Sequence, residues 1–93
     1  MTNKVTKQMI DDLMNRVTVH YTVTSVPTPH VVADAWLDDS FKLASATSKS
    51  VDPKEFDYEL GREYSKRDAI KLAEQKLWEL EGYRIFQLNS GNK

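Results

Sequence analysis

The C-terminal half of the chain holds a group of cationic and aromatic residues that could do chemistry. Arg67 and Lys71 stand four residues apart, with Tyr64 before them and Trp78 after them at helical spacing. On a helix these positions share one face. A guanidinium and an ammonium group bind phosphate, and an aromatic ring stacks on a base, so the pattern predicts a site for a small anionic ligand. The alternative is a solvated helix surface that carries ion pairs such as Glu63 with Arg67.

Residues suited to catalysis or metal binding are few. The two histidines, His20 and His30, are ten residues apart and no cysteine is present, so we expect no metal site. The three glycines are scattered, which excludes a P-loop or Rossmann fingerprint. No G-x-S-x-G turn surrounds the serines. The sequence therefore predicts no catalytic residue, no cofactor and no enzyme activity.

Composition limits the partners that the chain could bind. Its 93 residues predict a single domain over 1–93, with 89–93 as a frayed tail, and a modest core that favours a homo-oligomer. Thirteen basic and fourteen acidic residues give a net charge of −1, which counts against binding to duplex nucleic acid. No apolar run is long enough for a signal peptide or a membrane span. We expect a cytosolic protein without a membrane partner.

The elements that must position these residues can be read from periodicity. Apolar residues at helical spacing predict a helix over 5–17. Alternation rich in β-branched residues predicts strands over 18–26, 31–37 and 41–49, joined by short turns into an antiparallel meander. With a helical C-terminal half, the fold class is α+β. In the third strand, Phe41, Leu43 and Ser45 are expected to alternate with Lys42, Ala44 and Ala46.

The C-terminal helix is predicted to start firmly and to have a weak point. Asp52 can cap it, Pro53 suits its first turn, and Gly82 offers a C-cap after Glu81. Gly61 lies inside this segment, where glycine costs about 1 kcal/mol relative to alanine. The six residues after Gly82 are expected to be extended or irregular.

Two apolar stripes divide this helix. Phe56, Leu60 and Tyr64 form the first stripe, which extends toward Arg67, Lys71 and Trp78. The later apolar residues lie roughly a third of a turn away at 100° per residue. We therefore expect a long helical region that bends or breaks, or that carries a second apolar side which its own sheet does not cover. The residues of the second stripe are Ala69, Ile70, Ala73, Leu77 and Leu80.

The segment SVDPKEFDYELGREYSKRDAIKLAEQKLWELEGYRIFQL resembles the C-terminal signature of a family of small tailed-bacteriophage proteins, described by the gene-product numbers forty-nine and sixty-six. The resemblance covers roughly the last 45 residues. Family members often carry a cysteine before the signature, where this chain has Ala46-Thr47-Ser48, so a role for that cysteine is not implied here. The matching positions are Val51, Pro53, Phe56, Asp57, Glu59, Gly61, Ala69, Ala73, Trp78, Leu80, Gly82 and Tyr83.

The order of elements is also similar to that of phage anti-Thoeris sponge proteins. Those proteins resemble homo-oligomers that sequester cyclic ADP-ribose-type or cyclic oligonucleotide signals at a subunit interface. The resemblance implies that Phe41 stacks on a base, that Arg67 and Lys71 hold phosphate, and that Ser48 and Ser50 supply polar contacts. Lysine in place of a second arginine weakens bidentate phosphate binding.

Three hypotheses follow, in order of preference. The first is a non-enzymatic counter-defence protein that acts in the host cytoplasm and binds an anionic cyclic nucleotide at a homo-oligomer interface, with Tyr64 in the site and Trp78, Phe56 and Leu60 at the interface. The second is a phage protein that inhibits a host defence or nucleic-acid-handling protein by direct binding, with the stripe from Tyr64 to Trp78 as its contact patch. The third is a small phosphodiesterase.

Overall fold

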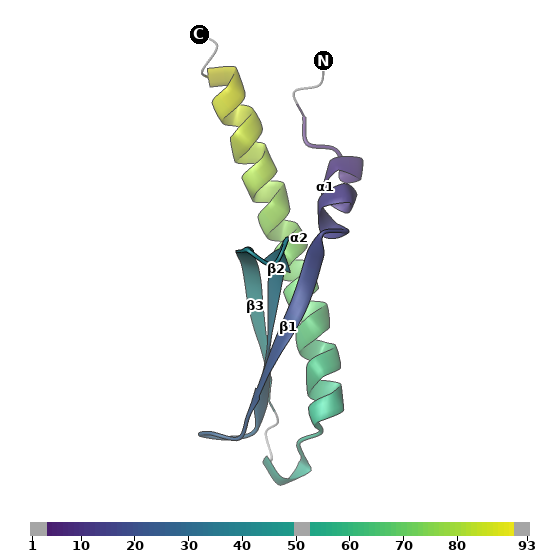
Figure 1. Cartoon of the computed structure of the whole chain (residues 1–93), viewed down its shortest axis with the longest axis vertical. Coiled ribbons are helices and arrows are strands. Elements are labelled where there is room, and N and C mark those ends of the chain that lie inside the picture. The colour runs from purple at the N-terminus through teal and green to yellow at the C-terminus, as the bar shows by residue number, and fades with distance from the viewer. Residues whose placement is uncertain (1–3, 50–52, 91–93) are drawn as a thin grey trace.

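A helix packs on one face of a three-stranded antiparallel sheet, and the α+β prediction is confirmed (Figure 1). The computed structural model describes residues 4–49 and 53–90. The sheet order is β1-β2-β3, so β1 and β3 are both edge strands. The elements are α1 (Lys7–Met14), β1 (Val17–Thr24), β2 (His30–Leu37), β3 (Phe41–Lys49), a 3-10 turn (Pro53–Glu55) and α2 (Tyr58–Ser90).

The N-terminal helix is shorter than the predicted 5–17. Thr6 caps α1 by accepting a hydrogen bond from the Met9 backbone N–H at 3.2 Å. At the other end, Val17 already belongs to β1, which pairs with β2 from its first residue. Ile10 is the buried anchor of α1 and joins the core beneath α2.

Small residues on α2 hold the helix close to the sheet. Ser65, Ala69 and Ala73 are fully buried at four-residue spacing, and Gly61 before them is buried too. The alanines of the sheet that complete this core, Ala33 and Ala35, are equally small and equally buried. Short side chains on both surfaces let the two backbones approach, which explains why a glycine and a serine occupy the interior of a long helix. Larger side chains complete the core: Ile10, Leu43 and Leu77.

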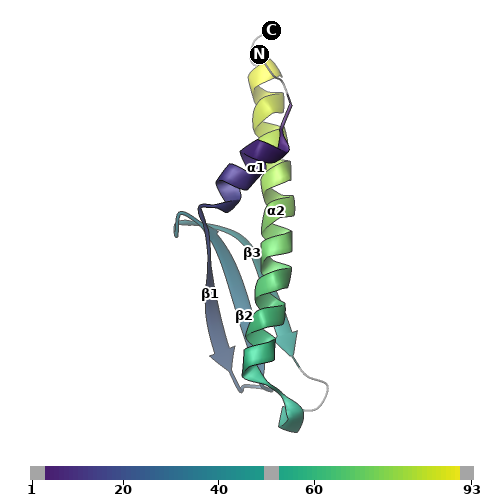
Figure 2. The same ribbon diagram turned by 90° about the vertical axis from the view of Figure 1, so that its right-hand side faces the viewer.

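The C-terminal helix is not broken, because α2 is a single helix of 33 residues (Figure 2). The two stripes have a simpler cause. Residues four apart form rows inclined by about 26° to a helix axis, so a buried row of this kind travels round a straight helix. The buried row runs from Gly61 to Leu77, whereas Leu60 and Tyr64 of the predicted first stripe are exposed.

Both predicted ends of α2 were wrong. The carboxylate of Asp57 caps it, accepting hydrogen bonds from the backbone N–H groups of Glu59 (2.9 Å) and Leu60 (3.3 Å). The residue predicted to do this, Asp52, lies outside the described residues. At the C-terminus, Gly82 does not adopt the positive φ of a C-cap, and the helix continues to Ser90 rather than ending at Glu81. The segment predicted to be extended is therefore helical, and so is the start of the predicted tail.

A β-bulge changes the predicted alternation in β3. The register shifts opposite Ala35 and Trp36, which pair with Ala44 and Lys42, so that Leu43 is the extra residue. Leu43 and Ala44 therefore both pack against the core, and Ala46 follows them there. The prediction that Ser45 lies on the same face as Leu43 was wrong: Ser45 turns to the open face, where its hydroxyl donates to Asp34.

The molecule is elongated, with extents of 59 × 22 × 22 Å. At 1.5 Å per residue α2 is about 50 Å long, whereas an eight-residue strand spans about 27 Å. The C-terminal part of α2 therefore runs past the sheet, with α1 beside it (Figures 1 and 2). Among the described residues, no helix has both the length and the apolarity needed to cross a membrane.

Candidate functional site

The surface of α2 divides into three rows of residues beside the buried one. Each row follows four-residue spacing, so it turns about 40° round the helix at each step, as the buried row does, and lies about 100° from the next. One row faces the β3 side, since Leu60 and Tyr64 line a pocket with Ser48 of β3. The row on the other flank faces β1, since Lys66 and Ile70 line a groove with β1 residues. The β3-side row is Leu60, Tyr64, Asp68, Leu72, Lys76 and Leu80; the β1-side row is Lys66, Ile70, Glu74, Trp78, Gly82 and Phe86; the outer row is Glu63, Arg67, Lys71, Gln75, Glu79 and Tyr83.

The two predicted phosphate-binding cations lie on the outer row, which faces away from the sheet. The guanidinium of Arg67 lies 5.0 Å from the centroid of the Tyr64 ring, in cation–π geometry. It also pairs with Asp68 at 3.8 Å, and its side chain is 70% exposed. Lys71 follows one turn later and is exposed. In one protomer this is an open helix surface rather than a concave ligand site.

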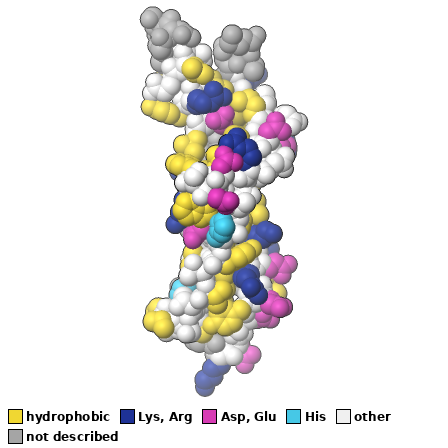
Figure 3. All heavy atoms as spheres, viewed as in Figure 1, with side chains coloured by type: hydrophobic (Ala, Val, Ile, Leu, Met, Phe, Trp, Pro, Cys, Tyr) yellow, Lys and Arg dark blue, Asp and Glu magenta, His cyan; other side chains and the backbone are white. Residues whose placement is uncertain are grey.

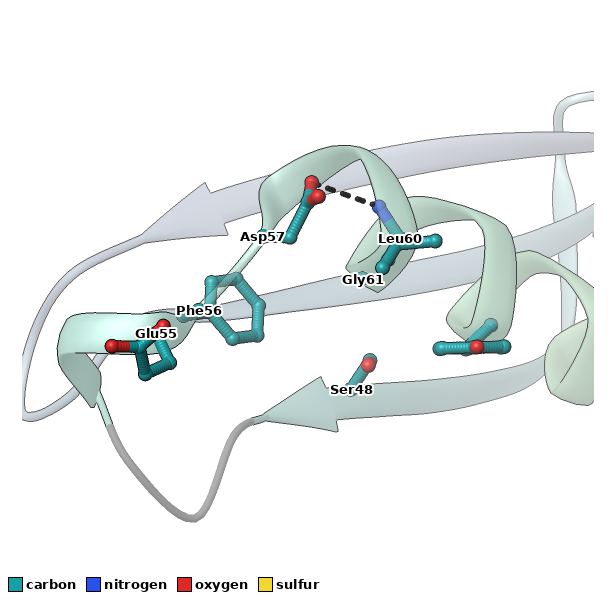
Figure 4. Close-up of a pocket in the computed structure, with 7 residues that line it drawn as sticks. Ser48, Glu55, Phe56, Asp57, Leu60 and Gly61 are labelled. Carbon is teal, nitrogen blue, oxygen red and sulfur yellow. Dashed lines mark hydrogen bonds between the residues drawn. The ribbon is translucent and has the colours of Figure 1, made fainter.

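A pocket of about 210 Å³ lies where β3 and the start of α2 meet (Figure 4). Two predicted ligand-binding residues, Ser48 and Tyr64, line it. Glu55 and Asp57 line it as well, and Asp57 is engaged as the cap of α2. Among the described residues the lining has two carboxylates and no cation, and this lining suits an apolar or cationic group better than a phosphate. The remaining lining residues are Phe56, Leu60 and Gly61.

The predicted ligand-binding residues do not form one cluster within a protomer. Phe41 pairs with Leu37 at the first residue of β3, whereas Ser48 pairs with Val31 near the other end of that strand. Seven residues of strand separate them, which is about 23 Å. Ser50 lies outside the described residues. The ligand-binding roles of all these residues stay predictions.

The predicted interface residues are spread along the length of α2, with about 27 Å of helix from Leu60 to Trp78. Phe56 and Leu60 lie at the β3-side pocket, and Phe56 contacts the Tyr58 ring edge-to-face with centroids 4.9 Å apart.

Trp78 belongs to the β1-side row and is 39% exposed. The expectation that Trp78 is not covered by its own sheet is confirmed. At 100° per residue Tyr64, Lys71 and Trp78 lie within about 40° of one another round α2, and Arg67 lies about 60° from Tyr64. The predicted stripe therefore shares one side of the helix, although its residues belong to three rows.

A second hollow lies between β1 and α2, because α2 packs mostly on β2 and β3. Its volume is about 410 Å³. Side chains from the inner face of β1 form its floor and residues of the β1-side row form its wall, so it is an apolar groove with one lysine. The lining residues are Met14, Val17, Val19, Tyr21, Lys66 and Ile70.

On the open face of the sheet, a histidine, a hydroxyl and a carboxylate meet at the turn between β2 and β3. Asp39 accepts a hydrogen bond from Thr18 and lies 3.0 Å from Nε2 of His20. These bonds from Thr18 and His20 hold the pKa of Asp39 below its ordinary value. The hydroxyl and the imidazole share one carboxylate, so the imidazole does not stand between nucleophile and acid as a catalytic relay requires. The cluster anchors the turn to β1.

The segment of α2 beyond the sheet carries its most exposed aromatic residues. Tyr83 and Phe86 are 60% and 62% exposed, and Trp78 begins the same segment. Gly82 lies between them on the helix, and a Cβ added there would meet no atom within 4 Å. We call Trp78, Gly82, Tyr83 and Phe86 the aromatic tip. Figure 3 shows hydrophobic side chains at the surface in this part of the molecule.

Sequence reasoning missed the aromatic tip because the prediction of Gly82 as a C-cap removed Tyr83 and Phe86 from the helix. It missed the β3-side row because it did not identify the row that packs on the sheet. The signal that could have found both surfaces is the four-residue spacing of Gly61, Ser65 and Ala69, which identifies the close-packed row and so fixes the others. Nothing in the sequence indicated the contact of Thr18 and His20 with Asp39, because it depends on the register between β1 and β2.

Comparison with known families gave one result. A family model described as "Phage protein (N4 Gp49/phage Sf6 gene 66) family" matches residues 5–88. The match spans both the sheet and α2, whereas the resemblance seen in the sequence covered the C-terminal half. Comparison with curated proteins gave no match, and comparison with solved structures gave none.

Proposed function

Because the chain belongs to the N4 Gp49/phage Sf6 gene 66 family of phage proteins, we propose that it acts during infection by binding a host protein directly. The proposed target is a defence protein or a nucleic-acid-handling protein, and binding inhibits it. The protein is non-enzymatic in this proposal. Its contact surface is the aromatic tip of α2.

The observation that carries this proposal is the exposure of Trp78, Tyr83 and Phe86 on a helix that continues past its own sheet. Tryptophan and tyrosine are enriched among the residues that contribute most to protein–protein binding. Trp78, Gly82 and Phe86 follow one another at four-residue spacing, which is the pattern of a helix that lies in a partner's groove. At Gly82 no side chain keeps the partner from the helix backbone.

The geometry reverses the order in which the sequence placed the first two hypotheses. Small-molecule sites are concave and cover most of the ligand. The concave site near Tyr64 is lined by Glu55 and Asp57, whereas Arg67 and Lys71 lie on an open surface. Exposed aromatic residues are enriched at protein–protein interfaces, and the aromatic tip of α2 supplies them.

Sequestration of an anionic cyclic nucleotide is the second candidate, and one observation favours it. The Arg67 guanidinium is already placed over the Tyr64 ring, with Lys71 one turn away. A second copy could provide the opposite wall that this surface lacks. Calorimetric titration with cyclic nucleotides tests this candidate, and binding that is lost in Arg67→Ala/Lys71→Ala would support it.

The main proposal is tested by affinity capture from infected cells, followed by calorimetry with the purified partner. We expect one stoichiometric host protein. Trp78→Ala and Phe86→Ala should each raise the dissociation constant by roughly thirtyfold, the effect of a hot spot worth about 2 kcal/mol. These side chains are exposed, so circular dichroism should show an unchanged fold.

Tyr58→Ala is the matched control, because it removes an exposed aromatic residue at the opposite end of the same helix. It should leave the dissociation constant within about twofold of the original protein. A partner that binds equally well to Trp78→Ala and Phe86→Ala would refute the assignment of the tip. The absence of any host partner, together with tight binding of a cyclic nucleotide, would favour the second candidate.

A further inference from the structure

We propose that two copies of the chain form a dimer in which their α2 helices run in opposite directions and cross at the β3-side row, about a two-fold axis at Leu72. Rows of four-residue spacing pack on each other when two helices cross at about 50°. Phe86 lies 14 residues, about 21 Å of helix, beyond Leu72, so the aromatic tip lies outside this crossing. The dimer does not depend on which host protein the aromatic tip binds.

The β3-side row exposes apolar side chains beside the core. Tyr64, Leu72 and Leu80 recur along it, and each is at least 38% exposed. At 100° per residue the row turns about 40° at each step, so Leu72 lies at the centre of the crossing, with Asp68 and Lys76 on either side of it. Tyr64 and Leu80 lie at its two edges. Exposed apolar side chains around one point of a helix form surface that a partner helix can cover.

The position of α2 on the sheet also favours this side. The helix packs mostly on β2 and β3, whereas β1 stands clear of it (Figure 2). Because β3 is an edge strand, α2 lies near the border of the sheet on this flank. A second copy that approaches the β3 edge can bring its helix to the 8–10 Å at which helices pack.

The charged residues of the β3-side row indicate that the partner helix belongs to a second copy of this chain. In an antiparallel pairing about Leu72, Asp68 of one protomer faces Lys76 of the other, and the symmetry repeats the pair. The same pairing places Tyr64 against Leu80. The row is therefore complementary to itself when reversed, which is the property that an isologous two-fold interface requires. A parallel pairing would place Asp68 beside Asp68 and Lys76 beside Lys76.

The ion pairs that Asp68 and Lys76 make within one protomer do not prevent them from pairing across the dimer interface. Asp68 lies 3.8 Å from Arg67, and Lys76 lies 3.5 Å from Glu79. The side chains are substantially exposed in both pairs, and such pairs contribute little to stability. Arg67 and Glu79 belong to the outer row, so they can remain beside Asp68 and Lys76 at the rim of the interface.

Sedimentation equilibrium of the full chain over a range of concentrations tests the proposal. We expect a dimer that Leu72→Asp converts to a monomer, because the two-fold axis would bring the two introduced carboxylates together. Asp68→Lys should raise the dimer dissociation constant roughly tenfold or more, because two attractive pairs become repulsive. Asp68→Lys/Lys76→Asp reverses both charges and should restore the constant to within about threefold of the original.

Lys71→Asp is the matched control, because it puts the same side chain one residue away on the outer row; it should leave the dimer intact. Thermal melts monitored by circular dichroism separate dissociation from unfolding. A wild-type chain that stays monomeric at millimolar concentration would overturn the proposal, and so would a dimer that Leu72→Asp leaves unchanged. The host-protein proposal is tested separately, because the monomeric Leu72→Asp variant should still bind the host partner through Trp78 and Phe86.

Discussion

The two glycines inside α2 occupy opposite environments. A Cβ added at Gly61 would lie 2.8 Å from Cζ of Phe56 and 3.1 Å from Cγ2 of Val31, so the sheet and the pocket require the absence of a side chain. At Gly82 the same atom would lie in open space. The first glycine is explained within the protomer, whereas the second remains available to a partner.

The two positions predict opposite effects of alanine on the free energy of unfolding. Gly82→Ala should raise it by about 0.5–1 kcal/mol, because alanine is the better helix former. Gly61→Ala should lower it by about 1 kcal/mol. The Phe56 ring can move away from the added methyl group, but Val31 is held in the sheet. The resulting overpacking therefore destabilises the fold by more than the higher helix propensity of alanine stabilises it. Urea denaturation measures both. Equal effects at the two positions would mean that α2 does not lie close to β2 at Gly61.

The turn between β2 and β3 makes stability depend on pH at the acidic end. Hydrogen bonding to Arg16 lowers the pKa of Asp38, and hydrogen bonding to Thr18 and His20 lowers that of Asp39, both from 3.8. Both carboxyls are therefore more acidic in the folded protein than in the unfolded chain. Their ionised forms stabilise the fold above about pH 4, and this contribution is lost as pH falls through the two lowered pKa values.

We expect the free energy of unfolding to fall more steeply below about pH 4 in the original protein than in Asp38→Asn/Asp39→Asn. Asparagine tolerates the positive φ that both residues adopt, 54° and 56°, so the turn itself should persist. Urea titrations at a series of pH values measure the difference. Parallel pH profiles for the two proteins would contradict the role given to these carboxylates.

Among the elements, α2 depends on its cap. Asp57 accepts two backbone hydrogen bonds at the start of the helix, and a cap of this kind contributes about 1 kcal/mol. Asp57→Ala should therefore lower the free energy of unfolding by about that amount, whereas Asp57→Asn, which keeps the acceptor, should change it little. If both variants unfold at the same urea concentration as the original protein, α2 begins elsewhere.

How well sequence predicted each element depended on whether local chemistry or packing decides it. The third strand was predicted with its observed bounds, because the turn residues Asp38 and Asp39 precede it and the Asp52-Pro53 pair follows it. The bulge at Leu43 was not predicted, because it arises from pairing with β2. For α2, Gly82 was predicted to end the helix, because glycine is common at helix C-caps. Gly82 departs from that role because the residues after it continue the helix.

At the scale of the molecule, an elongated body with one long helix leaves part of the surface of that helix for other molecules. The sequence predicted that α2 has apolar surface its sheet does not cover, and the exposure of Trp78 and Leu60 confirms this. It did not predict that the row from Gly61 to Leu77 is the one that packs on the sheet, because this depends on how closely the two backbones approach. Tyr64, Arg67 and Trp78, which the sequence placed on one surface, do share one side of α2. The sequence did not predict that this surface continues to Tyr83 and Phe86, because the helix was expected to end at Glu81.

Site-specific photo-crosslinking in infected cells tests most directly whether α2 is the surface through which this protein acts. A benzophenone amino acid is placed in turn at Trp78 on the aromatic tip, at Leu72 on the β3-side row, and at the exposed Thr47 of β3 as a control. We expect a crosslink to a host protein from position 78, a crosslink to a second copy of the chain from position 72, and neither from position 47. Products from position 47 alone would show that the protein works through its sheet and not through α2.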